Sequence, residues 1–363
     1  MTFTSILLFI IILLALVIVH ELGHFLAAKA LGVRVDEFAF GFPPKLFSKK
    51  FGETEYIFNL LPLGGYVKIH GEEGGEGETT DKRSLASKSW WQQLIVLLGG
   101  VAMNMLFALL ILIAISLGKT QVGEEDALFT RATDKKLIVT EVMEKSPADL
   151  AGLKKGDQIL ALSRKGEKAS TNSTKDAISF IQKSDDPVQI AYKNKSGVED
   201  VLTVAPVFGI LEGKKAIGVG LTVEGMAKLT FIEAVQKGTN DLVRFTILIA
   251  KAFKDFFVTL FSGGSIADQV AGPVGLAKVV HKAEEMGYKT VALLAAIISI
   301  NLAFFNTLPF PSLDGGRSVI VLGEAISRRK MNRKLFGVLN AIGFSFLMLL
   351  FVLVTIKDIF YSA

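Results

Sequence analysis

Three ionisable side chains follow a long uncharged stretch at the start of the chain. His20, Glu21 and His24 lie in the segment VIVHELGHFLAAKA (residues 17–30), and the nineteen residues before His20 carry no charge. Ionisable groups at membrane depth are costly in free energy, so they are usually retained for a functional reason. The position of these side chains therefore predicts a site with a chemical task.

The spacing of these residues matches the H-E-x-x-H pattern, in which two histidines bind zinc. On a helix, His20 and His24 lie on one face, so both imidazoles can reach one ion. Glu21 is offset by about 100° around the helix and can act as a general base toward a water at that ion. The alternative is a pair of histidines bonded to backbone carbonyls in a helix bundle. It explains neither the glutamate nor the depth.

A zinc site of this kind needs a third protein ligand. The chain has no cysteine, and its other two histidines, His70 and His281, lie in polar segments where we expect them to be solvated. Asp314, in the segment NTLPFPSLDGG, is the better candidate. The prolines of this segment interrupt a helix, and non-helical backbone at membrane depth must be covered by protein or a water-filled cavity. We expect residues 306–316 to line such a cavity, and a helix N-cap role for Asp314 remains the alternative.

The composition indicates a membrane protein, since half of the 363 residues are hydrophobic. A helix needs about 20 apolar residues to cross a hydrocarbon core. Four uncharged windows are long enough: residues 1–19, 94–118, 290–313 and 335–356. The first window lacks the basic region and cleavage site of a secretory signal, so we expect a retained helix. The predicted fold class is a polytopic α-helical membrane protein with about four transmembrane helices.

The distribution of Lys and Arg predicts the orientation of these spans. Nine Lys or Arg lie between residues 29 and 88, and a second basic group lies before the last window (Arg317, Arg328, Arg329, Lys330, Arg333 and Lys334). Basic connections usually face the cytoplasm, so we expect both termini and the long middle segment on the outer side. No Arg-rich or aromatic-interleaved patch indicates nucleic-acid binding.

Three segments outside the spans have patterns of their own. Residues 38–69 contain two apolar runs broken by prolines, which predict a membrane-associated β-hairpin region. Residues 119–226 contain strand-like runs, and their segment SPADLAGLKKGDQIL resembles a bacterial PDZ domain; a generic β-domain that acts as a spacer is the alternative. Residues 228–261 predict an amphipathic helix on the outer membrane surface.

The predicted domain organisation therefore has four parts. Residues 1–118 form a first membrane half, residues 119–226 an extracytoplasmic PDZ-like domain, residues 227–288 an amphipathic helix with a connector, and residues 289–363 a second membrane half.

Taken together, these motifs resemble the site-2 protease family of intramembrane zinc metalloproteases (peptidase M50), in its bacterial regulator-of-sigma-E protease type with a PDZ domain. HELGH, GFPPKLF…NLLPLGGYVKIHGE, AGPVGLAK and NTLPFPSLDGG follow one another as in that family over nearly the whole chain. The resemblance implies Zn²⁺ as cofactor, His20, His24 and Asp314 as its ligands, Glu21 as general base and Asn306 as a substrate-binding residue. One PDZ-like unit is visible, whereas some members have two.

The resemblance also implies a location and an activity. The location is the bacterial inner membrane, with the active site near the cytoplasmic side. The activity is hydrolysis of peptide bonds in or near transmembrane segments of single-pass proteins, such as anti-sigma factors or remnant signal peptides. A helical substrate must unwind first, because its carbonyls are bonded to N–H groups four residues on. An exposed β-edge can replace those bonds, so we expect Gly64, Gly65 and Tyr66 to hold extended substrate beside the metal.

Several alternatives remain beside this prediction. The hairpin could merely pack against the bilayer, and Asn104 could either hydrate the site or form a helix–helix hydrogen bond. A non-catalytic membrane adaptor, whose PDZ unit binds peptide C-termini, is the second function class; the complete set of Glu21, both histidines and Asp314 argues against it. A transporter is disfavoured because paired broken helices and repeat symmetry are not visible.

Overall fold

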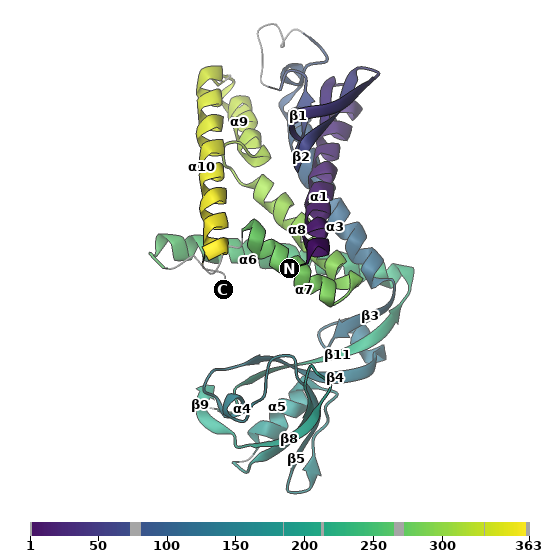
Figure 1. Cartoon of the computed structure of the whole chain (residues 1–363), viewed down its shortest axis with the longest axis vertical. Coiled ribbons are helices and arrows are strands. Elements are labelled where there is room, and N and C mark those ends of the chain that lie inside the picture. Colours follow the sequence, from purple (N-terminus) through teal and green to yellow (C-terminus); the bar gives the residue numbers. More distant parts are fainter. Residues whose placement is uncertain are drawn as a thin grey trace. The chain divides into compact units, whose positions relative to one another are not determined.

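The computed structural model describes residues 2–72, 81–183, 185–211, 214–264, 272–329 and 331–360. The chain divides into two compact units, one made of residues 1–115 and 235–363 and the other of residues 116–234. The first unit is mostly helical, and the second is built around a β-sheet (Figure 1).

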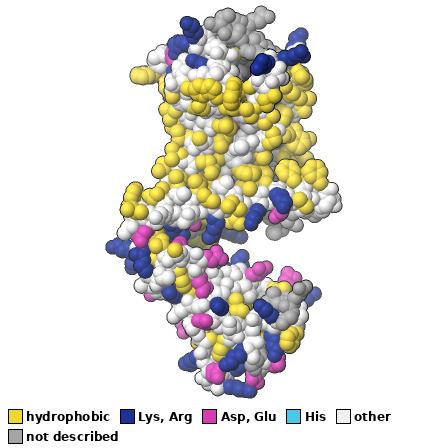
Figure 2. Space-filling model, turned by 180° about the vertical axis from the view of Figure 1, so that it is seen from behind, with side chains coloured by type: hydrophobic (Ala, Val, Ile, Leu, Met, Phe, Trp, Pro, Cys, Tyr) yellow, Lys and Arg dark blue, Asp and Glu magenta, His cyan; other side chains and the backbone are white. Residues whose placement is uncertain are grey.

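Four helices in the described part of the chain are long and apolar enough to cross a membrane. They are α1 (Phe3–Ala30), α3 (Gly99–Ser116), α8 (Tyr288–Thr307) and α10 (Arg333–Phe360). A broad band of hydrophobic side chains covers the helical unit, with Lys and Arg gathered at its end (Figure 2). Apolar surface of this extent suits lipid rather than water. The predicted number of spans is confirmed.

Two of the predicted windows have different limits in the structure. The second is interrupted at Leu98, which separates α2 (Trp90–Leu97) from α3. Two glycines follow this break, and glycine has a low helix propensity. The third window ends early, since α8 stops at Thr307 before the two prolines, and α9 (Asp314–Ser327) begins after them. Non-helical backbone therefore occupies residues 308–313, a shorter stretch than the expected 306–316, and the cavity expected there stays a prediction.

The predicted β-hairpin region is present as β1 (Val35–Phe51) and β2 (Thr54–Ile69). Residues 37–40 of β1 pair with residues 65–68 of β2 on one side and with residues 55–58 on the other. Within the described residues, 65–68 therefore form an edge of this sheet. The hairpin is anchored to the end of α1, where Ala28 and Val33 share a buried apolar cluster with Val35 and Ile69. This packing places one sheet edge close to the histidine-bearing helix.

Two more helices complete the helical unit. In α6 (Phe231–Phe261), which runs crosswise to α10 (Figure 1), Ile249 packs with Leu112 of α3 and Ile300 of α8. In α7 (Pro273–Glu285), Ala277 and Val280 pack against the first turns of α1. The amphipathic helix predicted for residues 228–261 is confirmed as a helix, and its place on the outer membrane surface stays a prediction. A short 3₁₀ helix (Leu85–Ser87) precedes α2.

The second unit contains a sheet with the strand order β3-β11-β4-β5-β7-β8, and β6 pairs with β5. Its core includes the fully buried Leu137, Ile159 and Ile190. The strand-like runs predicted for residues 119–226 are present as strands, while the identity as a PDZ domain stays a prediction. The elements are β3 (Gly118–Gly123), a 3₁₀ helix (Ala127–Arg131), β4 (Thr133–Val142), α4 (Pro147–Leu150), β5 (Gln158–Arg164), β6 (Glu167–Lys168), α5 (Thr174–Gln182), β7 (Val188–Lys193), β8 (Glu199–Val204), β9 (Val207–Leu211), β10 (Lys214–Ala216) and β11 (Val219–Leu229).

Candidate metal centre

The two histidines of the H-E-x-x-H segment lie one turn apart on α1 and face the same point. Both are 7% exposed, and their Nε2 atoms are 3.2 Å apart. The helix periodicity accounts for this arrangement, because residues four apart lie on one face. Two imidazole nitrogens that face each other at this distance in a buried place require a shared proton or a cation between them.

Asp314, the first residue of α9, completes this cluster. Its Oδ2 atom lies 3.1 Å from Nε2 of His20 and 3.3 Å from Nε2 of His24. The N-cap position of α9 is occupied by Leu313, so the alternative interpretation of Asp314 as the N-cap is wrong. Within the described residues, these three form a group of side chains that could hold a metal ion.

The three side chains fit zinc. Zinc bonds of about 2.0–2.1 Å in a tetrahedral site place the ligand atoms about 3.3–3.4 Å apart, close to the separations found here. The Oδ2 atom of Asp314 is buried and accepts no hydrogen bond in the described structure, which leaves it available to a cation. Two imidazoles and one carboxylate also leave a fourth position for water or substrate.

Close backbone contacts bring the neighbouring helices to this cluster. A Cβ atom on Gly100 of α3 would lie 2.6 Å from Cε1 of His20 and would also overlap Nε2 of His24. A Cβ on Gly315 or Gly316 would overlap backbone carbonyls of the segment between α8 and α9. Only glycine allows α3 to approach the imidazoles, and α9 to approach residues 307–311, so closely. Gly100 was not among the residues predicted for the site, although two adjacent glycines in an apolar window are a signal for close helix packing.

The helix that carries Asp314 is also fixed by Arg317. The Arg317 guanidinium donates to the carboxylate and to the backbone carbonyl of Glu72, which follows β2. It also lies 5.5 Å from the centre of the Phe336 ring on α10. This contact connects the hairpin region with the second membrane half, and the sequence alone did not indicate it.

Of the expected base and substrate-binding residues, Glu21 and Gly65 lie next to each other beside the metal centre. A Cβ on Gly65 would lie 3.7 Å from Cγ of Glu21, so the sheet edge passes directly beside the candidate base. Gly64 is next to the ring of Phe42, and the Tyr66 hydroxyl donates to Glu37 (2.9 Å). Asn306 is half-buried in the last turn of α8.

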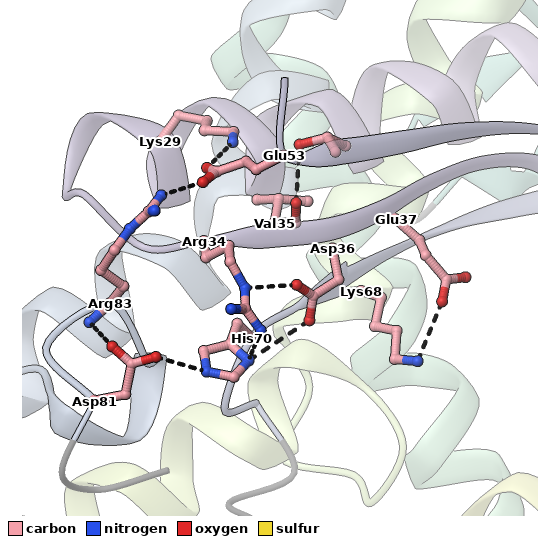
Figure 3. Close-up of polar contacts among 11 residues, drawn as sticks. Lys29, Arg34, Val35, Asp36, Glu37, Glu53, Lys68, His70, Asp81 and Arg83 are labelled. Atoms are coloured by element: carbon pink, nitrogen blue, oxygen red, sulfur yellow. Dashed lines mark hydrogen bonds and ion pairs between the residues drawn. The ribbon is translucent and has the colours of Figure 1, made fainter. Parts of the chain in front are cut away.

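The other two histidines are partly exposed and also have polar partners within the protein. His70 is held between Arg34 (2.8 Å to Nδ1) and Asp81 (3.0 Å to Nε2), with Asp36 nearby (Figure 3). His281 on α7 contacts Ser5 at the start of α1 (2.9 Å). Both histidines have polar partners from segments distant in the sequence, which a local pattern does not show. Neither belongs to the metal cluster.

A helix long and apolar enough to span a membrane carries two histidines and a glutamate and faces an aspartate at the start of α9, which together form the ligand set and base of a metallohydrolase. The sequence profile of peptidase family M50 matches residues 8–350, and the chain belongs to this family. It is therefore an integral membrane protein of a zinc protease family.

Individual relatives agree with this assignment. The chain is 29% identical to the zinc metalloprotease RasP of Geobacillus kaustophilus, over 99% of this chain and 98% of that protein. It is 36% identical to a protein of Clostridium perfringens, over 96% of both chains, and 32% identical to one of Clostridium acetobutylicum, over 99% of both. Both names assign these proteins provisionally to the zinc metalloproteases. Zinc is accordingly the cofactor.

Proposed function

We propose that the protein is an intramembrane zinc endopeptidase of the site-2 type, which cleaves single-pass membrane proteins in or near their transmembrane segments. The observation that carries this proposal is the group formed by the buried His20 and His24 on the candidate membrane span α1 and by the half-buried Asp314 at the start of α9. A site inside the helical unit reaches peptide bonds that lie in the bilayer.

Each of the site residues has a separate role in the proposed reaction. His20, His24 and Asp314 would hold the ion, which when bound supplies a Lewis acid that polarises the scissile carbonyl and makes water nucleophilic at neutral pH. Glu21, one residue after His20, takes the proton of the attacking water and passes it to the leaving amine. Asn306, in the last turn of α8, is the residue that we propose binds substrate backbone.

The sheet edge that residues 65–68 of β2 form within the described structure is the proposed place for the substrate. A cavity of about 730 Å³ borders this edge and is lined by Tyr66 and Val67 on one side and by Phe336 and Asn340 of α10 on the other. An unwound substrate can add as a strand to residues 65–68, which compensates the loss of its helical hydrogen bonds. Gly65 then brings the strand beside Glu21, since no side chain intervenes.

The remaining parts of the proposal concern location and partners. The protein lies in the bacterial inner membrane, with both termini and the PDZ-like domain outside and the metal centre near the cytoplasmic side. Anti-sigma factors and remnant signal peptides are the proposed substrates in regulated intramembrane proteolysis. The PDZ-like domain has peptide C-termini as its proposed partners.

A reconstituted cleavage assay tests the proposed activity. Purified protein in detergent is mixed with a panel of single-span substrates, with and without a zinc chelator. We expect cleavage that the chelator abolishes and added zinc restores. Glu21→Gln should keep zinc but lose activity, whereas Glu167→Gln, at an exposed position of the second unit, should behave like wild type. Cleavage by the Glu21→Gln variant at the wild-type rate would refute the proposal.

A further inference from the structure

The imidazoles of the metal cluster need partners on their outer nitrogens. In both rings Nε2 faces Asp314, so Nδ1 points away from the cluster. A histidine that binds a metal through Nε2 is neutral and carries its proton on Nδ1, where an acceptor fixes the tautomer and the ring orientation. Each ring therefore needs a hydrogen-bond acceptor beside its Nδ1 atom.

For His24 the acceptor is a backbone carbonyl. Nδ1 of His24 lies 2.8 Å from the carbonyl oxygen of Val96, which is fully buried in α2 near the break at Leu98. A carbonyl can only accept, so it selects the tautomer with the proton on Nδ1. This leaves Nε2 of His24 free to bind a cation.

For His20 the neighbour is the amide of Asn104 on α3. The Asn104 side chain is completely buried, and its Nδ2 lies 3.3 Å from Nδ1 of His20. In this orientation the amide donates to Nδ1, which would leave the proton on Nε2 and prevent metal binding. Meanwhile Oδ1 of Asn104 is buried without a partner in the described structure. The arrangement suits a cluster that holds a proton and not one that holds an ion.

Rotating the Asn104 amide group by 180° exchanges the atom that faces Nδ1 of His20. The oxygen and nitrogen of an amide are nearly the same size, so turning about the Cβ–Cγ bond exchanges them within the same space. Oδ1 of Asn104 then accepts from Nδ1–H of His20, as the Val96 carbonyl does from His24. At the far end of the amide one polar atom lacks a partner in either orientation.

We propose that Asn104 is a positioning residue whose amide oxygen holds His20 in the tautomer that binds zinc. Val96, Gly100 and Asn104 follow one another at intervals of four residues and together form the surface behind both imidazoles. The Ser299 hydroxyl of α8 donates to the backbone carbonyl of Asn104 (2.9 Å), which fixes this part of α3 without contacting the histidine. The proposal rests on His20 as a zinc ligand, as in the proposed function.

Zinc affinity of the purified full-length protein, measured by chelator competition, tests the proposal. Asn104→Leu keeps the volume but removes the acceptor, and we expect a 10- to 100-fold loss of affinity, about the cost typical of losing such a partner. Asn104→Asp keeps an acceptor and should retain most of the affinity. Ser299→Ala removes the other contact of the same residue and should leave zinc affinity unchanged.

Further results distinguish the role of Asn104 from the assignment of His20 as a zinc ligand. Unchanged affinity in Asn104→Leu, or an equal loss in Asn104→Asp, would overturn the role of Asn104. Unchanged zinc content in His20→Phe would instead overturn the ligand assignment. In wild-type protein with ¹⁵N-labelled histidine, the zinc-bound form should show the proton of His20 on Nδ1, whereas a proton on Nε2 would refute the proposal.

Discussion

Gly100 of α3 lies directly against the ring of His20 on α1. A Cβ atom at this position would be 2.6 Å from Cε1 of His20 and 2.8 Å from Nδ1. Since carbon atoms cannot approach so closely, any other residue must move either α3 or the imidazole. The geometry of the metal centre therefore requires glycine at position 100, where the methyl group of an alanine would overlap the imidazoles.

Gly100→Ala should lower zinc affinity and peptidase activity by at least tenfold, because the added methyl displaces the imidazoles. Ligand geometry tolerates only a few tenths of an ångström. Gly323→Ala is the matched control: this glycine lies in α9 with open space around it, and the alanine should stabilise the helix by about 0.5–1 kcal/mol. Zinc content and thermal unfolding measure both effects. Normal zinc affinity in Gly100→Ala would contradict the packing described here.

Arg317 and Glu72 should act as one unit that holds α9 to the hairpin region. Arg317→Met removes bonds to both the carboxylate and the carbonyl of Glu72, whereas Glu72→Gln weakens only the first. We expect a loss of unfolding free energy of about 1–3 kcal/mol for Arg317→Met and less for Glu72→Gln. Thermal unfolding in detergent of both variants and of the double variant tests this. Simple additivity of the two losses would show that the residues are not coupled.

Glu53 should make the hairpin region sensitive to acid. The hydrogen bonds from Lys29 and Arg83 lower the pKa of the Glu53 carboxyl below its ordinary value of 4.5 (Figure 3). A lowered folded-state pKa means that the stabilisation is fully present above pH 4.5 and is lost as the pH falls through the folded pKa. Wild type should therefore be more stable than Glu53→Gln at pH 6, and the difference should shrink toward pH 3. Unfolding of both proteins measured over this range gives the answer, and a constant difference would argue against the ion pairs.

Asp358, near the end of α10, should stabilise the start of α7. It is 3% exposed, and its carboxylate accepts from the backbone N–H of Gly275 (2.7 Å) in the first turn of α7. A negative charge is favourable at a helix N-terminus. Asp358→Ala should cost about 1–3 kcal/mol of unfolding free energy, because it leaves a part-buried N–H without this acceptor. Asp358→Asn keeps an acceptor and should cost less; equal stability of the alanine variant and wild type would contradict this role.

Much of the architecture could be predicted from local patterns. The four spans follow from uncharged windows of sufficient length, and the hairpin follows from alternating runs broken by prolines. The pair His20 and His24 follows from the period of a single helix. In each case the relevant residues are near one another in the chain, so spacing alone determines which face they share.

Other features became visible only in the tertiary structure. Asp314 could be a ligand or a cap until α9 was seen to begin beside α1, and the contact of Gly100 with the imidazoles was not expected. The contacts of His70 with Arg34 and Asp81 were not expected either. The carbonyl of Val96 has no sequence signal, because every residue carries the same group.

The sequence by itself thus determined the chemistry available on each helix and the segments that enter the membrane. The tertiary structure decided which side chains from distant segments meet. The physical reason is that hydropathy and helical period are properties of neighbouring residues. The approach of two helices depends instead on how their whole surfaces pack, down to a single missing methyl group at Gly100.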